Sequence, residues 1–181
     1  YERWNEVKVS DAAKRIGVST KSASRCFDEL EYLNIDVLGM KGKSRVINIP
    51  NDRKQVWQQI ENVLRNPVIR RFVLREDMKL EKKAGISALC EYSLLSDNVY
   101  PTYAVTKKEL KDSAVKVEKQ VSELEEIGCV VLELGYFIDF LGKGFQDPLS
   151  VVLSLTGEEQ EEERVDISIN EMLEEYVWSK D

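Results

Sequence analysis

The sequence predicts an α+β fold in two domains, one over residues 1–66 and a mixed α/β domain over residues 67–181. Three observations support this prediction. Residues 10–33 have the spacing of two helices around a glycine turn, and residues 35–49 hold two β-rich runs around a second glycine. After residue 67, runs typical of strands and runs typical of helices alternate along the chain.

Charge divides the chain in a similar way. Residues 1–75 hold 15 lysines and arginines against 9 acidic residues, whereas residues 76–181 hold 11 against 24. A basic region can bind phosphates, and an acidic region is repelled by them. We therefore expect the second domain to bind a partner protein or a second copy of itself.

The cysteines and the hydropathy bound the compartment. Cys26, Cys90 and Cys129 are isolated, the chain has no histidine, and no apolar run approaches about 18 residues. No signal peptide is visible. We expect a cytoplasmic protein with no membrane span, no metal and no cofactor, and we expect the cysteines to be small core residues.

The first two helices are predicted from caps and from apolar spacing. Ser10 is expected to cap the first helix, and Gly17 to end it in the left-handed conformation. Ser19 is expected to cap the second helix. The side chains expected to face inward are Ala13, Ile16, Val18, Ala23, Phe27, Leu30 and Leu33.

A hairpin and a connecting helix complete the predicted first domain. Residues 35–40 and 45–49 read as two strands around Lys41-Gly42-Lys43-Ser44, and residues 6–10 read as a further short strand. Asp52 is expected to cap a helix that runs to about Arg65, with Trp57 in the core. A hairpin placed directly after a helix pair is typical of the wing of a winged helix.

This order of elements resembles the helix-turn-helix of bacterial transcriptional regulators, whose second helix lies in the major groove. The segments SASRCFDELEYL, KGKSRVINI and DRKQVWQQIENVLRNPV look like MarR-type winged-helix regulators of Gram-positive bacteria. The resemblance implies a recognition helix over residues 20–33 and a wing over residues 40–45. Such domains have a helix before these two, so we expect it upstream of Tyr1, in a longer protein of which this chain is a fragment.

The second domain has a resemblance of its own. The segment AGISALCEYSLLSDNVYPTYAVTKKEL is similar to the segment that follows the winged helix in AbiEi-type antitoxins. DPLSVVLSL and RVDISINEMLEEYVW complete the same pattern. The resemblance implies repression of the protein's own promoter and a partner toxin.

The pattern also predicts the elements of the second domain. Strands are expected at residues 68–74, 102–106, 115–121 and 129–137, the third of these at a sheet edge. Helices are expected at residues 83–95, 107–112 and 165–178, and after the Asp147-Pro148 cap. Residues 157–163 are expected to be a solvated acidic link. The residues expected to face inward from these helices are Ile86, Leu89, Cys90, Leu94, Leu149, Val152, Leu153, Val165, Ile169, Met172, Leu173 and Tyr176.

Catalysis is not expected. A chain without histidine has no Ser-His-Asp triad, no Cys-His pair and no HExxH zinc site. A metal-dependent nuclease needs clustered carboxylates and a lysine, and Gly135 stands where that lysine would follow Glu133. Asp97, Asp139 and Asp147 are the other candidate carboxylates, and turn and cap roles account for Asp97 and Asp147.

The function expected from these features is sequence-specific binding of double-stranded DNA, in a transcriptional regulator that acts as a repressor. Arg25 is expected to pair with guanine, and Lys21 to contact a base or a phosphate. Asp28 and Glu29 are expected to limit insertion of the helix to its first two turns. The full set of expected DNA contacts is Thr20, Lys21, Ser22, Ser24 and Arg25 from the helix, and Lys41, Lys43 and Arg45 from the wing.

Three alternatives stay open at this point. The first domain can be a docking surface that binds protein and never touches DNA. The second domain can bind a partner toxin, or it can join two copies of the chain so that they match a palindromic operator. A metal-dependent nuclease in the second domain is a more distant third alternative.

Overall fold

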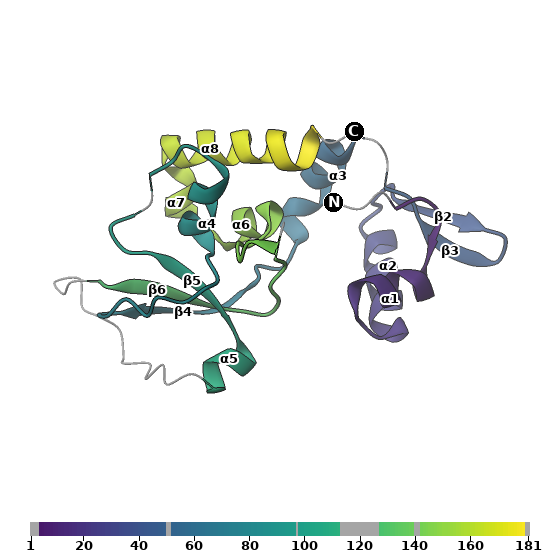
Figure 1. Ribbon diagram of the computed structural model, residues 1–181. Helices are drawn as coiled ribbons and strands as arrows, with labels where there is room; N and C mark the ends of the chain where they lie inside the picture. Colours follow the sequence, from purple (N-terminus) through teal and green to yellow (C-terminus); the bar gives the residue numbers. More distant parts are fainter. Residues whose placement is uncertain (1–3, 50–51, 97, 113–126, 140–141, 180–181) are drawn as a thin grey trace. The chain divides into compact units, whose positions relative to one another are not determined.

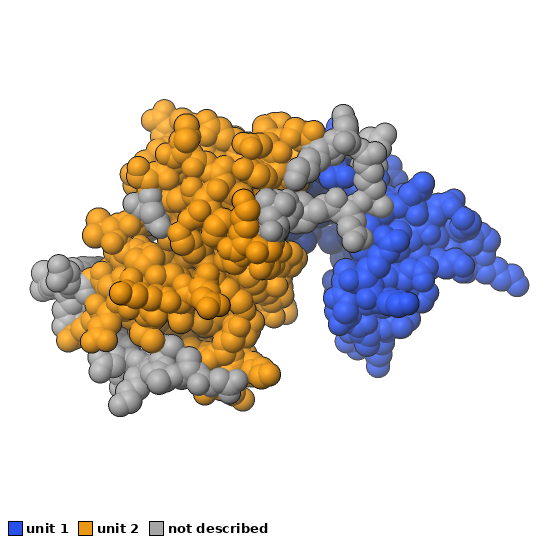
Figure 2. Space-filling view, viewed as in Figure 1, with its two compact units in different colours: residues 1–64 blue, residues 65–181 orange. Residues whose placement is uncertain are grey.

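The computed structural model describes residues 4–49, 52–96, 98–112, 127–139 and 142–179, and confirms an α+β chain. The chain forms two compact units, residues 1–64 (unit 1) and 65–181 (unit 2), coloured separately in Figure 2. The domain boundary predicted from the sequence lies after residue 66, and the observed boundary lies after residue 64. Each unit has its own sheet and its own core, so each is described by itself.

Unit 1 is built from short elements around a small antiparallel sheet (Figure 1). The sheet has the strand order β1-β3-β2, so the hairpin β2–β3 gains a third strand from the start of the chain. The elements in chain order are β1 (Val7–Lys8), α1 (Val9–Ile16), α2 (Thr20–Tyr32), β2 (Leu38–Lys41), β3 (Ser44–Ile47), α3 (Arg53–Ile60) and a 3-10 turn (Glu61–Val63).

Three residues were predicted to begin or end α1 and α2, and two of them do so. Gly17 ends α1 with φ +70°, and Ser19 caps α2 by accepting a hydrogen bond from the Ser22 amide. The predicted Ser10 cap is wrong, because α1 begins at Val9 and its N-cap is Lys8, two residues before Ser10. The helix starts directly from strand β1, which leaves Ser10 inside the first turn.

The core of unit 1 is small and apolar. Val7, Ala12, Phe27, Ile35, Val37 and Ile47 form its buried centre. Ala13, Ala23 and Trp57 are buried as predicted. Ile16 and Val18 were expected inside and are 53% and 42% exposed, because they flank Gly17 where α1 ends, whereas the buried residues of α1 are Ala12 and Ala13 in its middle. Leu30 is half-buried and Leu33 is exposed, so the buried stripe of α2 ends near Phe27.

The last helix of unit 1 begins as predicted and ends early. Asp52 caps α3 by accepting a hydrogen bond from the Gln55 amide. The helix stops at Ile60 and tightens into the 3-10 turn, where residues up to Arg65 were expected to stay helical. Val56 and Ile60 pack against the core of unit 1.

Unit 2 packs helices against a three-stranded mixed sheet of order β4-β6-β5. β6 pairs antiparallel with β4 and parallel with β5. Figure 1 shows α4, α6, α7 and α8 on one side of this sheet and α5 on the other. The elements are β4 (Val68–Leu74), α4 (Gly85–Tyr92), β5 (Thr102–Thr106), α5 (Lys107–Asp112), β6 (Cys129–Leu134), α6 (Pro148–Ser154), α7 (Gly157–Glu161), α8 (Glu163–Leu173) and a π-helix (Glu174–Trp178).

Local signals predicted several of these elements correctly. β4, β5 and α5 have the expected bounds, and Asp147 caps α6 with Pro148 at its first position. The buried residues of α8 match the prediction at Val165, Ile169, Met172 and Leu173, and Tyr176 is half-buried. The expected strand at 115–121 and the expected turn residue Asp97 lie outside the described residues.

Other expectations for unit 2 were wrong. Residues 157–163 are not a link, because Thr156 and Glu159 form a capping box that starts α7. α4 ends at Tyr92, which leaves Leu94 fully exposed beyond it. β6 ends at Leu134, before the expected Phe137. Val151 and Leu155 are the buried apolar residues at α6, whereas Leu149, Val152 and Leu153 are only half-buried.

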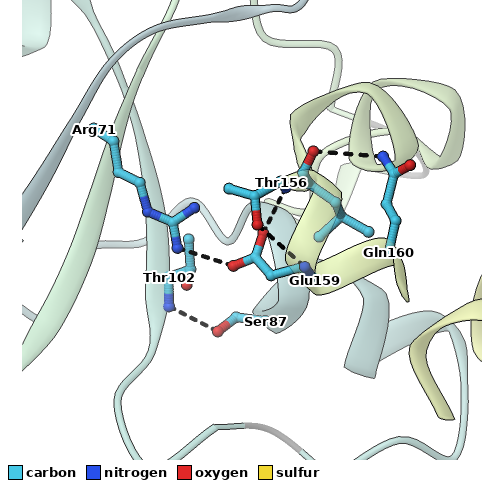
Figure 3. A network of polar contacts seen from close by, with 7 residues as sticks. Arg71, Ser87, Thr102, Thr156, Glu159 and Gln160 are labelled. Atoms are coloured by element: carbon cyan, nitrogen blue, oxygen red, sulfur yellow. Dashed lines mark hydrogen bonds and ion pairs between the residues drawn. The ribbon is translucent and has the colours of Figure 1, made fainter. Parts of the chain in front are cut away.

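Polar contacts tie α7 to the sheet (Figure 3). Arg71 on β4 donates to the Glu159 carboxylate at 2.9 Å. Burial opposes ionisation of Glu159, but the hydrogen bonds from Arg71 and from the Thr156 amide outweigh it and lower the pKa of Glu159. A separate hydrogen bond joins β5 to α4, because the Thr102 amide donates to the buried Ser87 hydroxyl at 2.7 Å.

A buried glutamine organises the helical side of unit 2. The Gln146 side chain accepts from the Gly85 amide at 3.2 Å and donates to the Ser154 hydroxyl at 2.7 Å. The Tyr92 hydroxyl donates to the Gln146 carbonyl at 2.8 Å. These bonds hold the segment before α6 against the start of α4, and Gln146 has no exposed surface.

Candidate nucleic-acid interface

The expected helix contacts all lie on α2 of unit 1. Thr20, Lys21 and Ser22 occupy its first turn, and Arg25 follows on the second. All four are exposed, and Ser24 between them is half-buried. Within the described residues neither Lys21 nor Arg25 forms an ion pair. The first two turns of α2 therefore present two cations and short hydroxyl side chains to solvent.

Ser22 has a second role that the sequence did not reveal. Its hydroxyl lies 2.9 Å from the hydroxyl of Ser19, and its amide donates to that same oxygen. The Ser22 side chain is thus part of the cap that starts α2. A contact from Ser22 to DNA has to share that hydroxyl with the cap.

Arg45 of β3 joins the hairpin to α2. Its guanidinium lies 2.5 Å from Asp28 and 3.2 Å from Glu31, and it donates to the Ser24 hydroxyl at 3.2 Å. We call these four residues the Arg45 cluster. Hydrogen bonding to Asp28 raises the pKa of Arg45. The structure thus brings two expected contacts, Ser24 and Arg45, together with each other.

The other two cations of the hairpin that were expected to contact DNA differ in their surroundings. Lys41 forms an ion pair with Glu6, which precedes β1. Lys43 lies in the hairpin turn after Gly42, whose φ is +63° as such a turn requires. Lys43 is exposed and, within the described residues, has no ion-pair partner.

Three acidic residues near the interface gained roles that sequence reasoning missed. Asp28 was expected to limit insertion of the helix, and Glu6 and Glu31 were assigned no role, yet all three form ion pairs with cations of the hairpin. The only sequence signal is the spacing of Ser24, Asp28 and Glu31 at i, i+4 and i+7, which places them on one helix face. Their partner depends on the sheet register, which the sequence does not specify.

The candidate carboxylates of a nuclease have other partners. Glu133 is buried on β6 and pairs with Arg70 of the neighbouring strand β4. Asp139 accepts a hydrogen bond from the Gly144 amide, and Asp147 caps α6. Among the residues that the structure describes, no group of three or more acidic, cysteine or histidine side chains could hold a metal ion.

The cysteines and the helices bear on two further expectations. Cys129 is buried, Cys90 is half-buried and Cys26 on α2 is exposed, so the expectation of three core cysteines was wrong for Cys26. Across the described parts of the chain, no helix is both long enough and apolar enough to cross a bilayer.

Comparison with known proteins gives no identity for the chain. No family model, no curated protein and no solved structure matches it.

Proposed function

We propose that the protein binds double-stranded DNA through unit 1 and acts as a transcriptional regulator, with α2 as recognition helix and the β2–β3 hairpin as wing. The observation that carries the proposal is the arrangement of unit 1. α1, the Gly17 turn and α2 precede a hairpin that is attached to α2 through Arg45. Exposed Lys21 and Arg25 occupy the first two turns of α2, where recognition helices contact base edges.

The charge of the exposed side chains supports the same proposal. Lys21 and Arg25 on α2 and Lys43 on the hairpin are unpaired within the described residues. Arg25 can form two hydrogen bonds with guanine, worth about 1–3 kcal/mol of discrimination, whereas lysines chiefly contact phosphates. Two of the three acids of α2, Asp28 and Glu31, have Arg45 as a counter-charge, so they repel a duplex less than free carboxylates would.

The test is DNA binding by the full chain across a salt series, with duplexes from its own promoter and scrambled duplexes of the same composition. Arg25→Ala is expected to reduce the preference for promoter DNA by about five- to 150-fold, since 1.4 kcal/mol is a factor of ten. Arg164→Ala removes the same charge from an exposed site on unit 2 and serves as the control. Equal binding of both duplexes by the wild type would refute a sequence-specific regulator.

A second candidate function concerns unit 2. Leu94 is fully exposed and lines a surface hollow together with Glu171, Glu174 and Glu175. An exposed leucine among carboxylates favours a protein partner with apolar and basic side chains, either a toxin or another regulator. The test compares the wild-type full chain with the Leu94→Ser variant. Copurification detects a partner protein and size measurement detects self-association, so the two measurements separate these functions.

A further inference from the structure

The Arg45 cluster divides α2 into two parts. Ser24, Asp28 and Glu31 follow one another at i, i+4 and i+7, so one face of the second half of α2 is directed at β3. Lys21 and Arg25 lie on the earlier turns and take no part in the cluster. Only the first part of the helix therefore presents cations that no carboxylate of the described residues holds.

The three wing cations divide in the same manner. Arg45 is 30% exposed and has two carboxylate partners, and Lys41 has one partner in Glu6. Lys43, in the turn, is exposed and without an ion-pair partner in the described parts of unit 1. A guanidinium whose Nη1 donates to two carboxylates and whose Nη2 donates to Ser24 is poorly placed to bind a phosphate as well, because these contacts fix its position and the two acids repel a phosphate.

We infer that Arg45 is a positioning residue, which holds the hairpin against the second half of α2, and that Lys43 is the wing residue that contacts phosphate. The inference about Lys43 rests on the proposed function, whereas the inference about Arg45 concerns the protein without DNA. Arg45 fixes the distance between recognition helix and wing. It also offsets one of the two negative charges that Asp28 and Glu31 would otherwise present to a bound duplex.

The Arg45 part is tested without DNA by hydrogen exchange of the full chain, read on peptides that cover residues 38–47. Arg45→Gln and Asp28→Asn are each expected to speed exchange about two- to fivefold, as loss of a surface ion pair predicts. The double variant is expected to exchange little faster than either single variant, because all three variants remove the ion pair between Arg45 and Asp28.

A matched carboxylate provides the control for this cycle. Glu29 is exposed on α2 and has no ion-pair partner among the described residues. Glu29→Gln is expected to leave exchange unchanged, alone or added to Arg45→Gln. The inference about Arg45 is overturned if Arg45→Gln does not change exchange, or if Arg45→Gln and Asp28→Asn act independently.

The Lys43 part is tested by DNA binding of the full chain across a salt series. Lys43→Gln is expected to flatten the slope of log affinity against log salt by about 0.9, the value for one lost phosphate contact. Arg45→Gln combined with Asp28→Asn keeps the net charge. It is expected to weaken binding about two- to fivefold with the slope unchanged.

Each outcome has one meaning. An unchanged slope for Lys43→Gln overturns the assignment of Lys43, and a slope flattened by the double variant shows that Arg45 contacts phosphate. If the wild type shows no salt-dependent binding, the proposed function fails and the Lys43 assignment fails with it. The exchange experiment still decides whether Arg45 positions the hairpin.

Discussion

In unit 1, Arg45 and Lys41 form their ion pairs at the surface, with the exposed carboxylates of Asp28 and Glu6. In unit 2, Glu133 and Gln146 make their polar contacts in the interior. Every buried polar or charged side chain among the described residues belongs to unit 2. Buried polar groups specify one packing because each needs its own partner, whereas exposed polar groups are available to a ligand. The difference favours recognition by unit 1 and a structural interior in unit 2.

The depth of the two cores gives the largest expected difference. Leu89 on α4 has no exposed surface and lies in the helical core of unit 2, whereas Leu33 at the end of α2 is 39% exposed. Leu89→Ala is expected to destabilise unit 2 by about 2–5 kcal/mol through lost burial and a cavity. Leu33→Ala is expected to cost unit 1 less than about 1 kcal/mol. Denaturant unfolding measures both, and equal losses would contradict a difference in core depth.

The buried polar network is expected to give the next effect. Gln146→Ala leaves the Gly85 amide without its partner in the interior, and the Ser154 hydroxyl keeps only its own bond to the Ser150 carbonyl. The expected loss for unit 2 is about 1–3 kcal/mol, the cost of unsatisfied buried groups. Gln160→Ala is the matched control, because Gln160 is exposed and bonds only to backbone carbonyls near the end of α6. A control as destabilising as Gln146→Ala would show that burial is not the cause.

The Gly17 turn of unit 1 is expected to give the third-largest effect on stability. A Cβ at Gly17 would meet no atom within 4 Å, so Gly17→Ala changes the backbone strain alone at φ +70°. The expected cost is about 1–2 kcal/mol, since alanine disfavours the left-handed region. Gly157→Ala, at the start of α7, also meets open space and has no positive φ. Thermal unfolding should show a loss for the first variant and little change for the second.

A surface ion pair of unit 2 gives the smallest effect and a dependence on pH. Hydrogen bonds from Lys82 and from the Thr106 amide lower the pKa of Glu109 to about 2. Because the folded pKa lies below the ordinary value of 4.5, this stabilisation is present above pH 4.5 and is lost as pH falls towards 2. Glu109 is 44% exposed, so solvent screening holds the effect to about 1 kcal/mol or less.

The measurement for this pair is the stability of Glu109→Gln and of the wild type at pH 7 and near pH 2. The difference is expected at pH 7 and should vanish near pH 2. Glu171→Gln, an exposed carboxylate on α8 without an ion pair in the described structure, is the control. A difference that persists near pH 2 would assign the effect of Glu109 to something other than its charge.

The predictions that were confirmed rest on local chemistry. Ser19, Asp52 and Asp147 cap helices as expected, because a cap needs only a side-chain oxygen and the backbone two or three residues ahead. The position of Gly17 is also decided locally, because the end of α1 needs a residue that adopts the left-handed conformation. The bounds of β4 and β5 follow from runs of β-branched and aromatic residues.

The wrong predictions concern residues whose structure depends on contacts with segments far away in the sequence. Residues 157–163 looked like a solvated link because of their acids, but Glu159 is held by Arg71, far away in the sequence on β4. Ile16 and Val18 are apolar but flank the Gly17 turn at the end of α1, whereas Ala12 and Ala13 are the residues of that helix that are buried. Within the candidate interface, the eight expected residues could be named from the sequence, but the partners of Arg45 and Lys41 could not.

If unit 1 binds DNA as proposed, the Arg45 cluster has a consequence for how a new DNA target can be acquired. The exposed residues Thr20, Lys21 and Arg25 can change without altering the attachment of the hairpin, because the attachment lies at Ser24, Asp28 and Glu31. A change at any of these three instead needs a matching change at position 45. Transplantation of a foreign recognition sequence into this scaffold therefore requires replacement of little more than the first two turns of α2, with Ser24 retained.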